Sequence, residues 1–403
     1  ITQDIVLPSS ITAIEDNSFN NSHINSIDIT NSTLINTIPT ACFINSKITY
    51  FNLPNITIFE QFAFKNCDEL TEITSSSINN LLHINDNCFE NCGKLAKITF
   101  NDSLLTIKNN SFKDCTALTE ITFGNSIKSI GNFAFSGCTQ IESLSFSESI
   151  TNIGISAFSG CSNLTSVTFG NALLKIDIEA FKNTSIESLS FGISLTEIGN
   201  NAFEDCTSIT SLSIENALNL LGESAFSGCI SIPSFTVPLS LKKISKFAFK
   251  DNSSLTQVTF DDFGSLTEIS ESAFENCNLL SLRFPSTLNI IGNNAFGNNN
   301  NLTNIDLNNN GGNITSISQD ALGGANVTNS GNRFIVRMRG AAGSNGATSY
   351  GGVGGYGSYL EFDLDMNSID TNKLYISLGG YGNSKLEVNR NVNGGGIGAG
   401  DSG

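Results

Sequence analysis

The sequence predicts a repeat solenoid, a fold in which successive turns of the chain stack along one axis and each turn adds one strand to a parallel sheet. One observation is a short string centred on Ala-Phe, which returns at spacings that are mostly 22 to 25 residues. A second is the apolar alternation that follows each copy, and a third is the apolar pair that precedes it. A period of this length predicts about fourteen turns of the leucine-rich-repeat kind. The repeated position holds Phe19, Phe43, Phe64, Phe89, Phe112, Phe135, Phe158, Phe181, Phe203, Phe226, Phe249, Phe274 and Phe296, with Leu322 in the same role.

Each turn contains one segment with the alternation expected of a strand. In the clearest copy, Leu164, Val167 and Phe169 are apolar, and the residues between them are polar. Successive side chains of a strand point to opposite faces, so this pattern buries the apolar residues and exposes the polar ones. A second apolar pair, such as Ile150 and Ile153, fits either a short extended segment or a helical turn. Stacking at about 4.8 Å per strand would bury both sets in a rod of roughly 65 Å.

The repeat stops near the C-terminal end, where glycine becomes frequent. We expect residues 1–328 to form the solenoid and residues 329–403 to form a small glycine-rich β module. Alternating patterns predict strands at Arg333–Arg339, Tyr359–Met366 and Leu374–Leu378. The chain starts without Met and stops within a glycine-rich tract, so we expect it to be a fragment of a longer protein.

Composition and charge exclude several classes of protein. Apolar residues make up 39% of the chain and charged residues only 14%, which is not the composition of a disordered protein. The formal net charge of -17 opposes binding to a phosphate backbone, so we expect no nucleic-acid partner. Because no stretch approaches about 18 consecutive apolar residues, we also expect no membrane-spanning segment in this sequence.

The ten cysteines occupy repeat positions, which favours free thiols over a disulfide framework. Cys42 and Cys88 take the Ala position before the repeat Phe, and the other eight follow that Phe by three residues. The second slot holds Thr184 and Asn252 in other turns, so it selects a small residue rather than a covalent partner. We predict buried free thiols that behave as small hydrophobes, with disulfides between adjacent turns as the alternative. The eight are Cys67, Cys92, Cys115, Cys138, Cys161, Cys206, Cys229 and Cys277.

No motif in the sequence points to catalysis, a metal or a cofactor. Cys88 and Cys92 resemble half of a zinc site, but no second pair completes four ligands. His23 and His83 stand at non-equivalent positions that we interpret as exposed loops. The glycines of residues 351–357 have nucleotide-loop spacing, yet no helical pattern follows them. We therefore predict a protein that is not an enzyme and has no cofactor.

Two further motifs are weak. Asp363, Asp365 and Asn367 imitate the start of a calcium loop, but Ser368 stands where the loop needs Gly, so an alternating strand is the better interpretation. Eleven Asn-x-Ser/Thr sequons occur, which is a number that the Asn, Ser and Thr content alone can produce. They permit glycosylation of a secreted chain without indicating it.

The outward side of the predicted strand is the candidate binding surface. In eight consecutive turns the residue between the last two apolar positions is a small hydroxyl residue, and the position two residues earlier is mostly polar and small. One hypothesis is an extended docking surface, of the kind that solenoids commonly use. The other is that Thr and Ser simply suit an exposed strand position. The candidate site residues are Thr99, Thr122, Ser145, Thr168, Ser190, Ser213, Thr236 and Thr259.

The repeat resembles a known family in its detailed residue pattern. The string that runs from residue 153 to residue 169 is Ile-Gly-x-x-Ala-Phe-x-x-Cys-x-x-Leu-Thr-x-Val-Thr-Phe, and it resembles the BspA-like leucine-rich repeats of bacterial and protist surface proteins. The resemblance covers about residues 1 to 328. The C-terminal stretch resembles, by composition, the glycine-rich modules of some animal and protist extracellular proteins.

The resemblance implies a function that the residues alone do not. It implies an extracellular or cell-surface adhesin that binds a protein or glycan of a host cell or of the extracellular matrix. An intracellular or appendage scaffold is the alternative, and a signal peptide in the full reading frame would separate the two. An ice-binding surface is a remote third hypothesis because flat Thr arrays can order water, although half of the positions are Ser.

Overall fold

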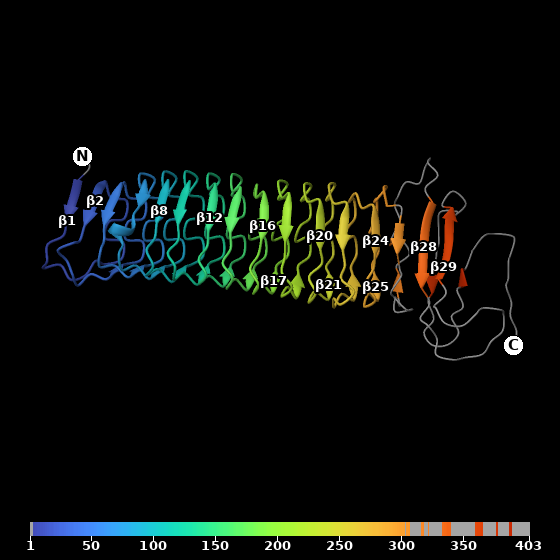
Figure 1. Ribbon diagram of the computed structural model, residues 1–403. Helices are drawn as coiled ribbons and strands as arrows, with labels where there is room; N and C mark the ends of the chain where they lie inside the picture. The colour runs from blue at the N-terminus through green and yellow to red at the C-terminus, as the bar shows by residue number, and fades with distance from the viewer. Residues whose placement is uncertain are drawn as a thin grey trace, which may run out of the picture.

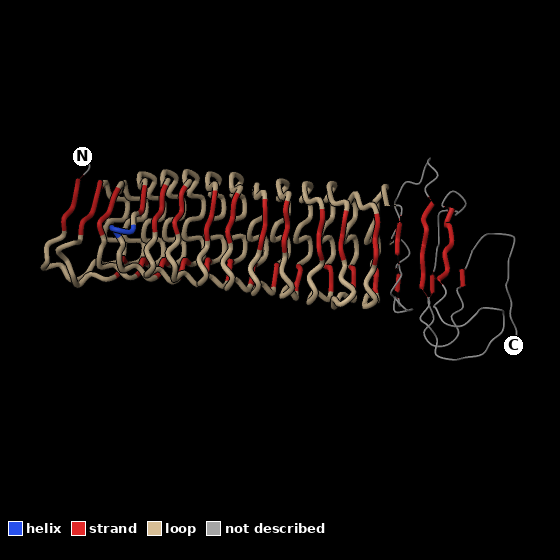
Figure 2. The backbone as a smooth tube through the Cα atoms, in the orientation of Figure 1, coloured by secondary structure: helices blue, strands red, loops and turns tan. Residues whose placement is uncertain are grey.

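The computed structural model is a long β-solenoid of about 13 turns, in which short strands lie across the axis of a rod (Figure 1). It describes residues 3–302, 304–306, 316–317 and 321, together with strand residues 333–339, 359–365, 376–377 and 387–388. Among these residues, the helical structure is a single 3-10 turn, η1 (Ser75–Ser77), which is the blue segment of Figure 2. The predicted fold class is confirmed.

Each turn adds one principal strand to a parallel sheet, as predicted. These strands hold the apolar alternation, and most of them are three residues long. The principal strands are β1 (Gln3–Val6), β2 (Ile24–Asp28), β4 (Tyr50–Asn52), β6 (Glu72–Ile73), β8 (Lys97–Thr99), β10 (Glu120–Thr122), β12 (Ser143–Ser145), β14 (Ser166–Thr168), β16 (Ser188–Ser190), β18 (Ser211–Ser213), β20 (Ser234–Thr236), β22 (Gln257–Thr259), β24 (Ser281–Arg283) and β26 (Asn304–Asp306).

The second apolar pair is extended, so the helical alternative for it is wrong. The second residue of each pair ends a two-residue strand. Among the described residues these strands pair in parallel from turn to turn, as Ile130 does with Ile153, except between Leu220–Leu221 and Lys243–Ile244. The second strands are β3 (Thr37–Ile38), β5 (Ile58–Phe59), β7 (His83–Ile84), β9 (Thr106–Ile107), β11 (Ser129–Ile130), β13 (Asn152–Ile153), β15 (Lys175–Ile176), β17 (Glu197–Ile198), β19 (Leu220–Leu221), β21 (Lys243–Ile244), β23 (Glu268–Ile269), β25 (Ile290–Ile291) and β27 (Ser316–Ile317).

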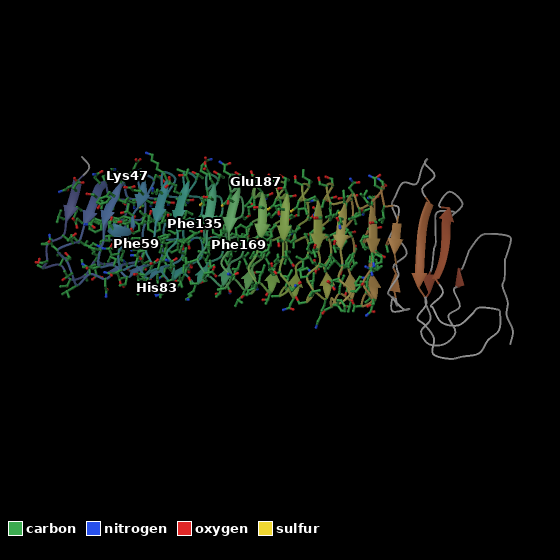
Figure 3. The ribbon with its side chains drawn as sticks, viewed as in Figure 1. Lys47, Phe59, His83, Phe135, Phe169 and Glu187 are labelled. Carbon is green, nitrogen blue, oxygen red and sulfur yellow. The ribbon has the colours of Figure 1, made fainter. Side chains whose placement is uncertain are left out.

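A column of stacked phenylalanine rings forms the centre of the core. From Phe19 to Phe296, the rings of successive turns are nearly parallel, with centroids 5.0 to 5.5 Å apart. Phe158 is fully buried between Phe135 and Phe181, as the register predicts. Figure 3 shows Phe135 inside the coil, whereas Glu187 lies at the edge where the principal strands begin. The ring column therefore ties each turn to both of its neighbours.

The thiols lie beside this column, and all ten are free and buried, as predicted. Each thiol three residues after the repeat Phe donates a hydrogen bond to the carbonyl oxygen of the Phe in the preceding turn, over 3.1 to 3.3 Å. The slot therefore selects a small hydrogen-bond donor, which the interpretation as a small hydrophobe missed. Burial raises the pKa of these thiols, to about 12 for Cys161 and for Cys277.

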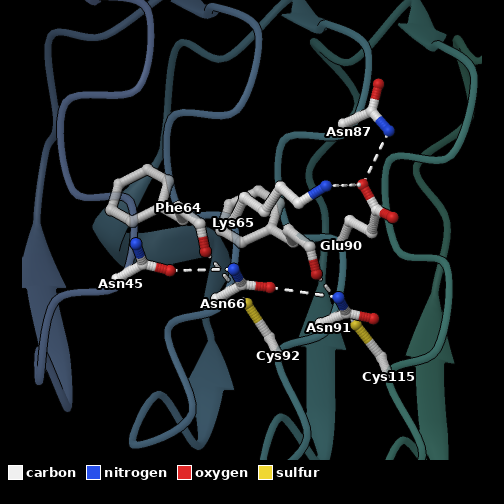
Figure 4. A network of polar contacts seen from close by, with 10 residues as sticks. Asn45, Phe64, Lys65, Asn66, Asn87, Glu90, Asn91, Cys92 and Cys115 are labelled. Atoms are coloured by element: carbon white, nitrogen blue, oxygen red, sulfur yellow. Dashed lines mark hydrogen bonds and ion pairs between the residues drawn. The ribbon is translucent and has the colours of Figure 1, made fainter. Parts of the chain in front are cut away.

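Residues with left-handed backbone conformation form the bend after each Phe. In the N-terminal turns this position is Asn, and the carboxamides form a ladder in which Asn66 Nδ2 donates to Asn45 Oδ1 (2.8 Å) and Asn91 Nδ2 donates to Asn66 Oδ1 (3.0 Å) (Figure 4). Gly137 holds the same position with φ +74°. Asn and Gly therefore satisfy the left-handed geometry of the bend.

Strands predicted near the C-terminal end are present. β28 (Arg333–Arg339) pairs in parallel with β26, and β29 (Tyr359–Asp365) pairs antiparallel with β28. A second antiparallel pair joins β30 (Ile376–Ser377) to β31 (Glu387–Val388). Leu322 and the glycine tract at residues 351–357 lie outside the described residues. The division at residues 328 and 329 remains a prediction.

The hydroxyl face of the principal sheet

The eight predicted site residues occupy equivalent positions on consecutive strands. Each is the last residue of its strand, from β8 to β22. Seven are exposed, and Thr99 is half-buried. Paired strands bring them into register, with Thr122 opposite Thr99, Ser145 opposite Thr168, and Thr236 opposite Thr259. The proposed site is thus a single row that follows the axis of the solenoid.

A second row of outward residues runs beside the first. It begins with Lys97 and Glu120, ends with Gln257, and holds serine on the five strands from β12 to β20. On those five strands both outward positions therefore carry a hydroxyl group. We call these ten residues the hydroxyl patch: Ser143, Ser145, Ser166, Thr168, Ser188, Ser190, Ser211, Ser213, Ser234 and Thr236.

The hydroxyl groups of the patch have no hydrogen-bond partners among the residues that the structure describes. All ten residues are exposed, and none makes a side-chain hydrogen bond to another described residue. Threonines at the edge of the sheet behave differently, because Thr165 Oγ1 donates to the Glu142 carbonyl oxygen (3.3 Å) and Thr210 Oγ1 donates to the Glu187 carbonyl oxygen (3.1 Å). The patch therefore presents free donors and acceptors to whatever lies against it.

Charged groups lie around the patch and not within it. An ion pair between Lys97 and Glu120 (2.8 Å) lies toward the N-terminal end, and the hydrogen bond from Lys97 to Glu120 raises the pKa of the lysine. Arg283 and Asp262 pair at 2.9 Å toward the C-terminal end. Glu142, which is exposed, lies directly before β12. The surroundings of the patch therefore disfavour polyanions, in agreement with the net charge of -17.

One shallow hollow of about 230 Å³ opens on this face, next to the patch. It lies between β10 and β12, where no backbone pairing joins the two strands among the described residues. The sequence gives no sign of this hollow, because the apolar pattern of these two turns is the same as that of their neighbours. The hollow is lined by Ile121, Thr122, Phe123, Asn125, Ser145, Phe146 and Ser147.

The remaining sequence candidates lie apart from this face. His23 is exposed, but the placement of His83 in a loop is wrong: it lies in β7, half-buried, with Nδ1 2.9 Å from Thr106 Oγ1. His83 takes the outward position of a two-residue strand, a strand too short to show alternation. Over the part of the chain that the structure describes, no three His, Cys, Asp or Glu side chains are grouped so that they could hold a metal ion. A search of the same residues finds no helix with the length and apolarity to cross a membrane.

Comparison with known proteins agrees with this geometry. A family model described as "BspA type Leucine rich repeat region (6 copies)" matches residues 1–83, 82–210 and 219–331. A leucine-rich repeat protein from Bacteroides ovatus has 24% identity and a TM-score of 0.63, over 76% of this chain and 81% of its own. A leucine-rich cell surface protein from Faecalibacterium prausnitzii has 20% identity and a TM-score of 0.42, over 84% and 88% of the two chains. No curated protein matches the chain.

The family match covers nearly all of the described solenoid, with a gap at residues 211–218, and the Bacteroides structure has the same fold. The residues that the family model covers include the whole phenylalanine column and eight of the ten residues of the hydroxyl patch, all except Ser211 and Ser213. The chain therefore belongs to the BspA-type leucine-rich repeat family.

Proposed function

We propose that this chain is a non-enzymatic binding protein of the cell surface or extracellular space, which attaches to host-cell or matrix macromolecules through the hydroxyl patch. The observation that supports this most is the uniformity of the patch. Ten exposed, uncharged hydroxyl residues, which have no side-chain partners in the described part of the chain, extend over five strands. A surface of this kind can form many weak hydrogen bonds with a long partner, and their sum gives useful affinity.

The other sheet of the same molecule provides an internal comparison. The outward positions of the second strands also have to suit a strand residue at the surface, yet they hold polar, charged and apolar residues. From β13 to β21 they hold Asn152, Lys175, Glu197, Leu220 and Lys243, and the Lys175 and Glu197 side chains form an ion pair at 3.0 Å. Strand propensity alone would give similar residues on both sheets. The difference favours a binding role for the principal sheet.

A direct test replaces hydroxyl residues with arginine. Thr168, Ser213 and Thr236 are exposed, so the triple variant should fold normally, since exposed substitutions change stability by about 0.5 kcal/mol or less each. We expect its adhesion to matrix-coated surfaces and to host cells to fall sharply, because three bulky charges interrupt a flat neutral surface. Equal adhesion by the variant and the wild-type protein would refute the role of the patch.

A matched control separates the patch from a general effect of charge. Asn152, Leu220 and Ile290 hold the corresponding outward, exposed positions of the second strands. Arginine at these three positions adds the same charge to the other sheet, and we expect adhesion to remain at the wild-type level. Loss of adhesion in both variants would show that added charge, and not its position, controls binding.

In-register hydroxyl rows also support a second candidate, an ice-binding surface. Ser143, Ser145, Ser166 and Thr168 pair in register on β12 and β14 and form a regular two-row array. Thermal hysteresis of the purified protein tests this candidate, and a freezing point equal to the melting point would eliminate it. The scaffold alternative requires self-association, which light scattering at increasing protein concentration would detect.

A further inference from the structure

The hollow between β10 and β12 is lined by both apolar and polar side chains. Three apolar side chains form its floor, and Phe123 and Phe146 stack there with centroids 5.3 Å apart. Ile121 is half-buried, whereas the equivalent residues of the adjacent turns, Ile98 and Leu144, are buried. The Ile121 side chain is therefore partly exposed at this hollow.

Polar groups without partners surround this floor. The Thr122 and Ser145 hydroxyls and the Asn125 carboxamide make no hydrogen bond to another described residue through their side chains. Only the backbone N–H of Asn125 is engaged, and it donates to Asp102 Oδ1 over 2.8 Å. A carboxamide both donates and accepts, and each hydroxyl can do either. The hollow therefore offers an apolar surface beside free hydrogen-bonding groups.

Charge and size limit what can bind there. None of the lining side chains is charged. Two acidic residues lie close by: the Asp102 carboxylate accepts the hydrogen bond from the Asn125 backbone, and Glu148 follows the lining residue Ser147 in the sequence. Acidic neighbours repel carboxylated or sulfated ligands. A volume of about 230 Å³ is below the roughly 300 to 1,000 Å³ of pockets for drug-sized ligands, so only one small unit fits.

We infer that this hollow binds a single uncharged sugar residue of a longer glycan. A pyranose ring has an apolar C–H face, which would lie on Ile121, and hydroxyl groups at its edge, which would reach Asn125 and Ser145. The remainder of the glycan would continue along the hydroxyl patch, since Ser145 belongs to both surfaces. This inference rests on the proposed function and names the chemical class of its partner.

The test uses one variant with a matched control. Asn125→Leu removes the hydrogen-bonding groups of the carboxamide with little change in side-chain size, and it keeps the backbone hydrogen bond to Asp102. Asn171 is the equivalent exposed residue two turns further on and does not line the hollow, so Asn171→Leu is the control. The far-UV circular dichroism of both variants should match the wild-type spectrum.

Binding is measured on an array that carries neutral, sialylated and sulfated glycans. We expect the wild-type protein to bind neutral glycans, Asn125→Leu to bind them about tenfold more weakly, and Asn171→Leu to bind them like the wild type. Binding to charged glycans alone, no binding to any glycan, or equal binding by the two variants would overturn the inference. If the arginine variant of the patch loses adhesion while periodate oxidation of the target surface has no effect, the proposed function stands and this inference fails.

Discussion

Replacing Phe158 with alanine tests the stacked core at its centre. The Phe158 side chain is fully buried, and its ring lies 5.2 Å from that of Phe135 and 5.3 Å from that of Phe181. The ring of Phe146 meets it edge-on at 5.8 Å. Truncating a buried Phe to Ala costs about 3 to 5 kcal/mol, because transfer free energy is lost and a cavity remains. Three aromatic contacts, each worth about 0.5 to 1.5 kcal/mol, place this variant at the upper end of that range.

The measurement is urea unfolding followed by circular dichroism, with Phe133→Ala as the control. Phe133 lies two residues before the ring column, is 39% exposed, and stacks on none of the column rings. We expect the free energy of unfolding to fall by about 4 to 5 kcal/mol for Phe158→Ala and by less than about 1 kcal/mol for Phe133→Ala. Similar losses in the two variants would show that the ring column does not hold the turns together.

Three further predictions concern the interior. Asn252 is fully buried and its carboxamide has no hydrogen-bond partner among the described residues, so Asn252→Cys, which can donate to the Phe226 carbonyl oxygen, should raise the free energy of unfolding by about 1 to 3 kcal/mol. Asn299→Cys should lower it by a similar amount in the same urea titration, because Asn299 Nδ2 donates to the Phe274 carbonyl oxygen (2.8 Å) and its Oδ1 accepts from Leu279 N (3.0 Å). Burial raises the pKa of the thiols, so the stability that they contribute is complete below the unfolded-state pKa of about 8.5 and is lost as the pH rises toward the folded value. By pH 10, each thiol should lower the free energy of unfolding by about 1 to 2 kcal/mol. A circular dichroism spectrum that is unchanged at pH 10.5 would contradict this prediction.

The sequence predicts most of this fold because every turn repeats the same packing problem. A Phe at a fixed position has to stack on the Phe of the next turn, and the alternation after it leaves one outward face, so Phe158 and Thr168 could be placed from the pattern alone. The second segment was ambiguous, since a spacing of three between Ile150 and Ile153 fits both a strand and a helical turn. Only the pairing of Ile153 with Ile130 decides for the strand.

Other features depend on contacts that no local pattern records. Phe133 (φ 55°) and Phe247 (φ 58°) have left-handed backbone conformation, which bulky residues avoid unless the surrounding turns impose it. The hydrogen bond from each thiol to a Phe carbonyl oxygen joins adjacent turns, so it follows from the stacking and not from the residue type. In the same way, the hollow beside Asn125 is formed by residues of two turns, those of β10 and β12, whose sequence pattern is the same as that of their neighbours.

The candidate site could be predicted from the sequence in part. Each hydroxyl position could be predicted from strand alternation, but the charge-free area appears only when the register places both rows side by side, as with Ser188 opposite Ser211 and Ser190 opposite Ser213. Whether a partner binds there depends on chemistry beyond this chain. A polar strand surface has the same local pattern whether or not it is a binding site.

The most direct test of the binding role is the protection of one engineered thiol on the patch. Because all ten native thiols are buried, Ser190→Cys should be the single reactive thiol of the folded protein, and Asn152→Cys should provide the same probe on the other sheet. Maleimide labelling of both variants is timed in solution and after attachment to an extracellular-matrix preparation. We predict that attachment slows labelling at Ser190→Cys and leaves the rate at Asn152→Cys unchanged. If Ser190→Cys is labelled at the same rate in solution and when attached to the matrix, the proposal that the hydroxyl patch is the binding surface is contradicted.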